Sequence, residues 1–544
     1  MAWRAYGRLS NLDESGDVVG ETVRSILLAS LERDAQRPYL WFQNEELSLT
    51  QTLEELNRDA NRVANGLRRL GLRKGERIAL MVNNGPEFLA IWLGSAKIGL
   101  SIVPVNTSFV GREAKYVVAH SDARMLFLSA GFGELLPEIW AAEALDFVIS
   151  VHGPIDGVSS LKSFMAPEDG EPPDCGLVDT DEAAILYTSG TTGSPKGCVV
   201  ANDYYSSNAH RYAELMRLSP ADRAITPLPL FHMNPQLTTI LATLLVNANA
   251  ALLDRFHPTT WWSSIRSSGA TVFNYLGVMP AILMGLPPRA DDRDHPARLG
   301  QGAGVPGALH RPFEERFGTK LVEVFGMTET GINFAAPLEG ERHVGTHSFG
   351  VPLRDFRPRV VDEEDRDVPD GEPGELVLRG SDDDRPWATF ATEYYKSPEA
   401  TEAAWRGGWF HTGDIIVREP AGWFRFFGRR KDIIRRSGEN IAAAEVEEVL
   451  LMHPGVVDAA ALPVPDPTRE QEVAAIIVLV EGEDQPEVTP AAIWDWCEKR
   501  LAYFKVPRYI VFRSTLPRTS TQKTAKNVLV REFEQQVGMI YDRT

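Results

Sequence analysis

The chain contains very little cysteine, and the cysteines it has are far apart. Only Cys175, Cys198 and Cys497 occur among 544 residues. With no close pair among them, they form neither a disulfide framework nor a zinc-binding pattern. Such low cysteine use favours a reducing compartment, so we expect a cytoplasmic protein.

The chain also lacks the patterns that direct a protein into a membrane. Its N-terminal residues, MAWRAYGRLSNLDESGD, do not show the basic-then-apolar order of a secretory signal. The longest apolar stretches, residues 88–105 and 237–253, are interrupted by Lys97 and by Asn247 and Asn249. Each stretch therefore predicts a buried helix followed by a strand, and we expect no membrane span.

A surplus of positive charge is missing as well. Lysine and arginine number 56 against 75 aspartate and glutamate residues, which gives a net charge of −19. This charge argues against nucleic acid or an anionic membrane as a partner, and an anionic ligand would need a local positive site. The length of 544 residues exceeds one compact core and predicts at least two domains. Assembly into a homodimer is left open.

What the chain does have is a conspicuous loop sequence, LYTSGTTGSPKG, at Leu186–Gly197. Apolar residues on both sides predict a strand, a loop and a second strand. Glycine backbone N–H groups, hydroxyls and the Lys196 ammonium suit a polyphosphate. It is not a Walker A loop, because Pro195 precedes the lysine and glycine follows it. The alternative is a flexible linker rich in Ser, Gly and Thr.

This loop resembles the phosphate loop of the adenylate-forming (AMP-binding) superfamily. Further segments similar to that family's motifs follow in its order: LPLFH (228–232), GAGVP (302–306), FGMTET (325–330), WFHTGD (409–414), GRRKD (428–432), SGEN (437–440) and PRTSTQKTAK (517–526). The resemblance covers nearly the whole chain. It is most like the acyl-CoA synthetases, in particular the crotonobetaine/carnitine-type and medium-chain acyl-CoA ligases.

Apolar periodicity independently indicates an α/β protein. Residues 50–72 show helical apolar spacing, residues 87–99 are also expected to form a helix, and residues 78–82 and 101–105 are expected to form buried strands. After about residue 340 the turns become frequent and the apolar runs short, which predicts a β-rich region.

The predicted domain boundary lies in the segment GRRKD, where Gly428 offers backbone freedom before a polar joint. We expect a large multi-layer N-terminal domain with a β-rich subdomain, residues 1–430, carrying the acyl and ATP sites. A small mobile α/β domain, residues 431–544, would carry the adenylation lysine, as the resemblance implies.

The resemblance implies ATP and Mg²⁺ as ligands, with Glu329 binding the metal through a hard oxygen donor. Phe325 would stack on adenine and Asp414 would accept hydrogen bonds from the ribose hydroxyls. The full set expected to contact ATP or AMP is Thr188, Ser189, Gly190, Thr191, Thr192, Gly193, Lys196, Gly302, Ala303, Gly304, Glu323, Phe325, Gly326, Met327, Thr328, Asp414, Arg429 and Lys523.

Three residues are implied to act at the reacting atoms. Thr328 would contact the α-phosphate, His232 would shape the site beside the acyl carboxylate, and Lys523 would bridge that carboxylate and the α-phosphate. The family usually has glycine before this lysine, whereas this chain has Gln522. Lys526 is therefore an alternative assignment, although the upstream match favours Lys523.

The second half of the reaction would involve coenzyme A and a domain rotation. The resemblance places the hinge at Lys431 and the pantetheine tunnel at Ser437, Gly438 and Glu439. Hinges of this kind are a few residues that absorb a change in φ and ψ. Other acceptors remain open, namely a carrier protein, an amine or nitrite, and so does a non-catalytic nucleotide-binding relative.

The acyl pocket is expected to be open, because Gly326 stands where acetate-specific relatives have a bulky aromatic residue. Its predicted lining consists of His232, Asn274, Tyr275, Leu276, Gly277, Gly326 and Phe334. This mixture of aromatic, amide and small residues indicates a medium-sized carboxylic acid with room for a polar group.

Overall fold

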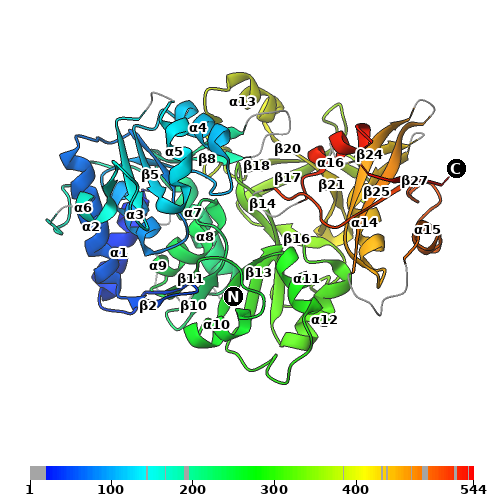
Figure 1. Ribbon diagram of the computed structural model, residues 1–544, viewed down its shortest axis with the longest axis horizontal. Coiled ribbons are helices and arrows are strands. Elements are labelled where there is room, and N and C mark those ends of the chain that lie inside the picture. Colours follow the sequence, from blue (N-terminus) through cyan, green and yellow to red (C-terminus); the bar gives the residue numbers. More distant parts are fainter. Residues whose placement is uncertain are drawn as a thin grey trace.

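Three β-sheets with helices packed on them make up the molecule (Figure 1). This computed structural model describes residues 20–141, 145–165, 167–188, 195–383, 385–429, 433–436, 439–466, 469–480, 488–519, 524–536 and 538–543. No helix in those ranges is long and apolar enough to cross a membrane.

The first sheet contains eight strands and begins the large part of the molecule. Its order is β19 (Glu393–Tyr394), β9 (Lys196–Ala201), β8 (Glu182–Thr188), β4 (Ser101–Pro104), β3 (Arg77–Met81), β5 (Met125–Ser129), β6 (Phe147–Val151) and β7 (Ser159–Ser160). Helices α2 (Leu53–Arg69) and α3 (Pro86–Lys97) pack on each other beside it, and α4 (Gly111–His120) precedes β5.

These elements follow the apolar pattern of the sequence. Helix α2 starts with a capping box in which the Thr52 hydroxyl accepts from Glu55 N, and its apolar face is fully buried. It approaches α3 so closely that a Cβ at Gly94 would lie 2.5 Å from the Ala60 carbonyl oxygen. The predicted helices and strands between residues 50 and 105 are thereby confirmed.

The second sheet contains thirteen strands and carries the centre of the molecule. Its order is β17 (Phe356–Val361), β18 (Pro373–Gly380), β20 (Phe410–Arg418), β21 (Phe424–Arg429), β16 (Ser348–Pro352), β15 (Gly331–Ala335), β14 (Lys320–Met327), β13 (Leu299–Ala303), β12 (Val272–Leu276), β10 (Arg223–Thr226), β11 (Asn249–Leu253), β1 (Leu40–Gln43) and β2 (Ser48–Gln51). The strands from β14 to β10 run parallel, whereas those from β14 to β17 are antiparallel. The predicted β-rich texture after residue 340 is confirmed.

Two separate apolar cores cover the two faces of the parallel part. One contains Val272 and Val322 together with side chains of α1 (Val23–Asp34) and α7 (Asn202–Leu215). The other contains Phe273 and Tyr275 with residues of α10 (Trp261–Ser268), α11 (Val278–Gly285) and α12 (Gly307–Phe317). Successive residues of each strand thus enter different cores.

The third sheet belongs to the C-terminal part and lies at one side of the molecule in Figure 1. Its order is β23 (Glu439–Ala442), β22 (Ile433–Arg436), β25 (Glu470–Leu479), β26 (Tyr509–Arg513) and β27 (Ile540–Asp542), with β24 (Val456–Asp466) also on β25. Its helices are α14 (Ala443–Leu451), α15 (Pro490–Glu498) and α16 (Lys526–Glu534). Thr489 caps α15, and its side chain accepts from Ala492 N.

The chain passes from the second to the third sheet between β21 and β22, and residues 430–432 lie outside the described ranges. The boundary at 430/431 stays a prediction. Gly428, expected to offer backbone freedom, lies inside β21, and its φ is not in the left-handed region. A Cβ there would be 2.9 Å from the Ile433 side chain, so close packing explains this glycine better.

Candidate functional site

The loop motif is flanked by two paired strands, as predicted. Strands β8 and β9 are antiparallel, and Thr188 stands opposite Lys196 at the end of the ladder. The intervening residues Ser189, Gly190, Thr191, Thr192 and Gly193 lie outside the described ranges. The far edge of β9 pairs with the two-residue strand β19, where Tyr394 stands opposite Cys198.

Tyr394 connects this hairpin to the carboxylate of Glu329. Its hydroxyl donates a hydrogen bond of 2.8 Å to Glu329 Oε1, and both side chains are buried. The Lys196 ammonium lies 5.0 Å from the centre of the Tyr394 ring. The backbone of Ala391 donates to the Glu329 carbonyl oxygen at 2.7 Å. One tyrosine thus brings together the predicted phosphate-binding lysine and the predicted metal ligand.

Sequence reasoning missed Tyr394. A two-residue strand is too short for an alternating apolar pattern, and the tyrosine is more than 60 positions from Glu329. The one local signal is the adjacent pair Tyr394–Tyr395, whose hydroxyls reach different partners. Tyr395 donates to Asp122 at 2.7 Å and accepts from Arg77 at 2.6 Å.

A second buried carboxylate fixes the loop at residues 302–305. Glu323, on β14, accepts hydrogen bonds from Gly304 N at 2.8 Å, from Val305 N at 3.4 Å and from the Tyr275 hydroxyl. Burial raises the pKa of Glu323, while these donors act in the opposite direction. Glu323 therefore positions the loop predicted to flank adenine, of which Ala303 and Gly304 are exposed.

Two glycines permit close backbone approaches around this loop. Gly277 donates to the Ala303 carbonyl oxygen at 2.9 Å, and a Cβ on it would lie 1.8 Å from the Gly304 oxygen. A Cβ on Gly302 would collide with Tyr275. The predicted acyl-pocket residues Tyr275 and Gly277 are thus in direct contact with the predicted adenine loop.

The segment FGMTET forms the hairpin turn between β14 and β15. Phe325 is half-buried and packs 4.9 Å from Phe349, between ring centres, while Met327 and Thr328 are half-buried. Gly326 is exposed, and a Cβ on it would lie 2.4 Å from the Gly331 oxygen. Glycine at 326 is thus required by the hairpin itself, in addition to leaving space beside Phe325.

The remaining acyl-pocket residues differ in their surroundings. Phe334 is fully buried between Phe325, Phe349 and Phe424, with ring centres 4.9–5.9 Å apart. Asn274 is fully buried and donates to the Thr239 hydroxyl at 2.8 Å. Leu276 is partly buried, as is His232, which stands at the start of α8 (Met233–Pro235).

Asp414 lies buried in β20, and its backbone pairs with that of Arg429 on β21. Several predicted residues lie outside the described part of the chain: Lys431, Ser437, Gly438 and Lys523, together with the side chains of Arg429 and Glu439. Lys526, the alternative to Lys523, begins α16 and forms an ion pair of 2.6 Å with Glu447 of α14.

A direct contact joins α14 to the large part of the molecule. His347 Nε2 lies 2.9 Å from Glu448 Oε1, and the ion pair raises the pKa of His347 and lowers that of Glu448. A Cβ on Gly307 would lie 3.2 Å from both side chains. The third sheet is therefore attached next to the start of α12, immediately after the loop that Glu323 fixes.

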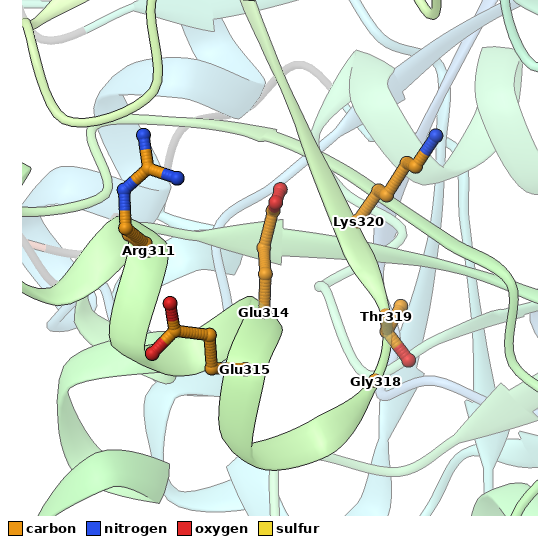
Figure 2. Close-up of a pocket in the computed structure, with 6 residues that line it drawn as sticks. All are labelled: Arg311, Glu314, Glu315, Gly318, Thr319 and Lys320. Atoms are coloured by element: carbon orange, nitrogen blue, oxygen red, sulfur yellow. The ribbon is translucent and has the colours of Figure 1, made fainter.

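A surface depression of about 220 Å³ lies elsewhere, around the end of α12 and the start of β14 (Figure 2). Its lining of Arg311, Glu314, Glu315 and Lys320 carries both signs of charge. Glu314 accepts two hydrogen bonds from Arg342, and its pKa is lowered to about 2. Since Phe325–Met327 occupy the opposite end of β14, this depression is separate from the candidate site.

Comparison with protein families identifies two matching regions. Residues 29–382 match the AMP-binding enzyme family, and residues 445–523 match the AMP-binding enzyme C-terminal domain. The chain is 33% identical over 486 residues to a crotonobetaine/carnitine–CoA ligase from Salmonella paratyphi A, covering 87% of this chain and 92% of that protein. It is 32% identical to the protein of the same description from Escherichia coli O1:K1 / APEC, with the same coverage.

Solved structures show the same fold. An anthranilate CoA ligase, AuaEII, in complex with anthranoyl-AMP superposes with a TM-score of 0.85 at 26% identity, covering 95% of this chain and 98% of that one. ATP-bound MatB from Rhodopseudomonas palustris gives 0.83 at 25% identity, covering 95% and 100%. The predicted α/β architecture, with a large N-terminal and a small C-terminal domain, is thereby confirmed.

Proposed function

Because the chain belongs to the AMP-binding enzyme family, among the AMP-forming acid–CoA ligases, we propose that it activates a medium-sized carboxylic acid and transfers it to coenzyme A. In the first step a carboxylate oxygen attacks the α-phosphorus of ATP, and pyrophosphate leaves. In the second step the thiol sulfur attacks the acyl carbonyl carbon, and AMP leaves.

The observation that carries this proposal is the junction of Lys196, Tyr394 and Glu329. It places a cation at the base of the phosphate hairpin and a carboxylate on the neighbouring turn. Activation of a carboxylate by ATP brings two anions together, so charges fixed in advance lower the barrier.

The donor set around Glu329 suits Mg²⁺. Across the described residues there is no group of three or more His, Cys, Asp or Glu side chains that could enclose a metal ion. Mg²⁺ commonly uses one or two carboxylates and completes its shell with phosphate and water oxygens. When bound, Mg²⁺ would supply charge neutralisation at the phosphates. The Tyr394 hydroxyl donates to Glu329 Oε1 and so orients the carboxylate.

Other residues of the chain hold the nucleotide and the acid. Thr328 donates from its hydroxyl to the α-phosphate, and Thr188 and Lys196 bind the phosphates further along. Phe325 stacks on adenine against the loop that Glu323 fixes, while Asp414 and Arg429 bind the ribose side. These roles come from the family motifs. Thr188, Lys196, Phe325 and Thr328 are half-buried and Asp414 is buried, which accords with ligand contacts.

Lys523 bridges the carboxylate and the α-phosphate in the first step. The ion pair of Lys526 with Glu447 supports this assignment, because the alternative lysine already has a structural partner. For the second step the C-terminal domain rotates about Lys431. Ser437, Gly438 and Glu439 then line the pantetheine tunnel beside His232.

The identity of the acid is not carried over from the relatives, whose names specify crotonobetaine, carnitine and anthranilate. Glycine at 326 beside Phe325 favours an acid larger than acetate. The acceptor is coenzyme A, in line with the CoA ligases among the relatives.

Acid-dependent release of pyrophosphate from ATP, measured over a panel of carboxylates, tests the first step. Transfer is then assayed with coenzyme A, a phosphopantetheine carrier protein and nitrite as separate acceptors. Pyrophosphate release with turnover on coenzyme A supports the proposal. Release with turnover on another acceptor alone overturns the CoA step, and no release with any acid overturns the whole.

The two half-reactions separate further in the Lys523→Ala variant. We expect it to lose adenylate formation and to retain thioester formation from supplied acyl-adenylate. Lys526→Ala is the matched control. Selective loss in the control instead would move the catalytic role to Lys526.

A further inference from the structure

A group of neutral polar side chains lies buried around Asn274, one of the predicted acyl-pocket residues. Asn274 on β12 and Gln301 on β13 are direct neighbours in parallel strands, so their side chains share one face of the sheet. Tyr212 of α7 lies against the Asn274 amide, and Thr239 accepts a hydrogen bond from it. All four side chains are fully buried.

Most of the polar atoms in this group lack hydrogen bonds. Both amide atoms of Gln301 have no hydrogen-bond partner among the described residues. Asn274 Oδ1 and the Tyr212 hydroxyl have no partner of normal length and angle either, although these two side chains lie close enough for the Asn274 amide to act against the rise in the pKa of Tyr212. A buried polar atom left unpaired costs about 1–3 kcal/mol, and natural proteins contain few of them. Four such atoms on three neighbouring residues are therefore an unusual concentration.

The group also lies next to the elements of the proposed site. Gln301 directly precedes Gly302 of the adenine loop, and Thr239 belongs to the π-helix Gln236–Leu241, which starts four residues after His232. Such π-helical turns often occur at functional sites. One turn before Tyr212, Asn208 accepts from Ile332 N at 2.8 Å and thereby contacts the hairpin that follows Glu329.

We propose that Asn274, Gln301 and Tyr212 form the far end of the acyl pocket and recognise a neutral polar group on the acid, such as a hydroxyl or a carboxamide. This inference rests on the proposed adenylating function and specifies its substrate class. The acid's carboxylate lies toward His232 and Thr328, and its polar end donates to Asn274 Oδ1 and accepts from the Gln301 amide.

The neutrality of the group defines the substrate class further. None of its members carries a charge, and burial raises the pKa of Tyr212, so its hydroxyl stays protonated. Two charged residues, Arg298 and Asp222, also act on the Tyr212 hydroxyl. They form an ion pair with each other, with Arg298 Nε 3.1 Å from Asp222 Oδ1. A charged acid terminus would thus lose its hydration without gaining a counter-ion, which is strongly unfavourable.

The test compares acids of matched length that end in a methyl, a hydroxyl, a carboxamide, a trimethylammonium or a carboxylate group. Pyrophosphate release gives kcat/KM for each. For acids long enough to reach Asn274, Gln301 and Tyr212, we expect kcat/KM to be at least about tenfold higher with a hydroxyl or carboxamide end than with a methyl end. The reason is that a site built for hydrogen bonds rejects analogues that lack them.

Two variants remove the hydrogen-bonding atoms and keep the volume. Gln301→Met and Tyr212→Phe should each lower kcat/KM for the polar acid and leave that for the methyl acid unchanged or higher. The control is Thr243→Val, which removes a fully buried hydroxyl one turn beyond Thr239 that bonds to the Thr239 and Ile240 carbonyl oxygens and to the Tyr39 hydroxyl. It should leave the preference unchanged, and thermal melts establish that each variant folds.

The possible results distinguish failure of this inference from failure of the proposed adenylating function. Pyrophosphate release that favours methyl, cationic or anionic termini at every length overturns the inference and leaves adenylation standing. An unchanged polar preference in Gln301→Met and Tyr212→Phe overturns it as well and indicates that the group binds water only. The absence of release with every acid overturns both.

Discussion

Buried polar groups on the two faces of the β12–β13–β14 sheet differ in how completely they are hydrogen-bonded. On one face Tyr275 and Glu323 stand on either side of Gly302, and the carboxylate accepts three hydrogen bonds. On the other face, one residue earlier on each strand, Asn274 and Gln301 carry unpaired polar atoms in the structure as far as it is described.

The difference distinguishes polar groups that stabilise the fold from those that we infer to bind the acid. A carboxylate with donors on both oxygens is fixed and can fix a loop in turn. An amide with no partner makes the free protein less stable than an apolar residue would, so its benefit must come from binding. Glu329 is intermediate, because it is buried and accepts a hydrogen bond from Tyr394 but is also the predicted metal ligand.

The largest effect on turnover is expected at Glu329. Glu329→Gln keeps the shape and can still accept from Tyr394, but it loses the charge for the metal. We expect turnover to fall by about 100-fold or more, with a melting temperature near that of the wild type. Turnover against Mg²⁺ concentration, together with a thermal melt, checks this. Unchanged Mg²⁺ dependence would contradict a metal role.

On the face that carries Tyr275 and Glu323, the substitution Glu323→Gln should weaken both ATP binding and stability. The amide has only one oxygen, so its NH₂ would face either Gly304 N or Val305 N, a donor facing a donor, and the loop would lose an anchor. We expect the KM for ATP to rise by about tenfold and stability to fall by about 1–3 kcal/mol. Steady-state kinetics at varied ATP and denaturant unfolding measure both. A change in stability without a change in KM would show that the loop does not bind ATP.

Removing the hydroxyl of Tyr394 should have a smaller, more specific effect. Tyr394→Phe releases the Glu329 carboxylate, and we expect the Mg²⁺ requirement for pyrophosphate release to rise by about five- to tenfold. Thioester formation from supplied acyl-adenylate should be unaffected. Tyr395→Phe is the matched control, because its hydroxyl bonds to Asp122 and Arg77 instead. Equal effects of the two variants would indicate a merely structural tyrosine.

The comparison between the two faces can also be tested by stability alone. Tyr275→Phe removes a paired hydroxyl and should cost about 1–3 kcal/mol. Gln301→Met replaces unpaired atoms by apolar ones and should change stability by less than about 0.5 kcal/mol, or increase it. Denaturant midpoints of both variants decide the matter. Equal destabilisation would remove the distinction between the faces.

The smallest effect concerns the contact of α14 with the large domain. The pKa of His347 is raised from its ordinary 6.5, so its attraction to Glu448 is complete below that value and is lost as pH rises through the raised one. Glu448 stays ionised because its own pKa is lowered from 4.5. Glu448→Gln should therefore destabilise by under about 1 kcal/mol near pH 6 and by less near pH 9. A pH-independent difference in melting temperature would contradict the pairing.

The sequence by itself determined the superfamily and several elements of the first sheet. Its motifs identified an adenylate-forming enzyme, which the family match confirms. Periodicity located α2 because that helix buries one face, whereas α3 is buried on nearly all sides and stands out as an apolar run. The assigned roles of Lys523, Lys431 and the tunnel residues stay predictions.

Only the tertiary structure decided which distant side chains meet. Tyr394 reaches Glu329 because β19 adds to the edge of β9, and Gly428 is small because Ile433 packs on it. The paired face and the unpaired face of one sheet differ by a single step along each strand, which a local pattern does not reveal. Motifs report local chemistry, whereas hydrogen-bond satisfaction depends on neighbours that folding brings from many positions away.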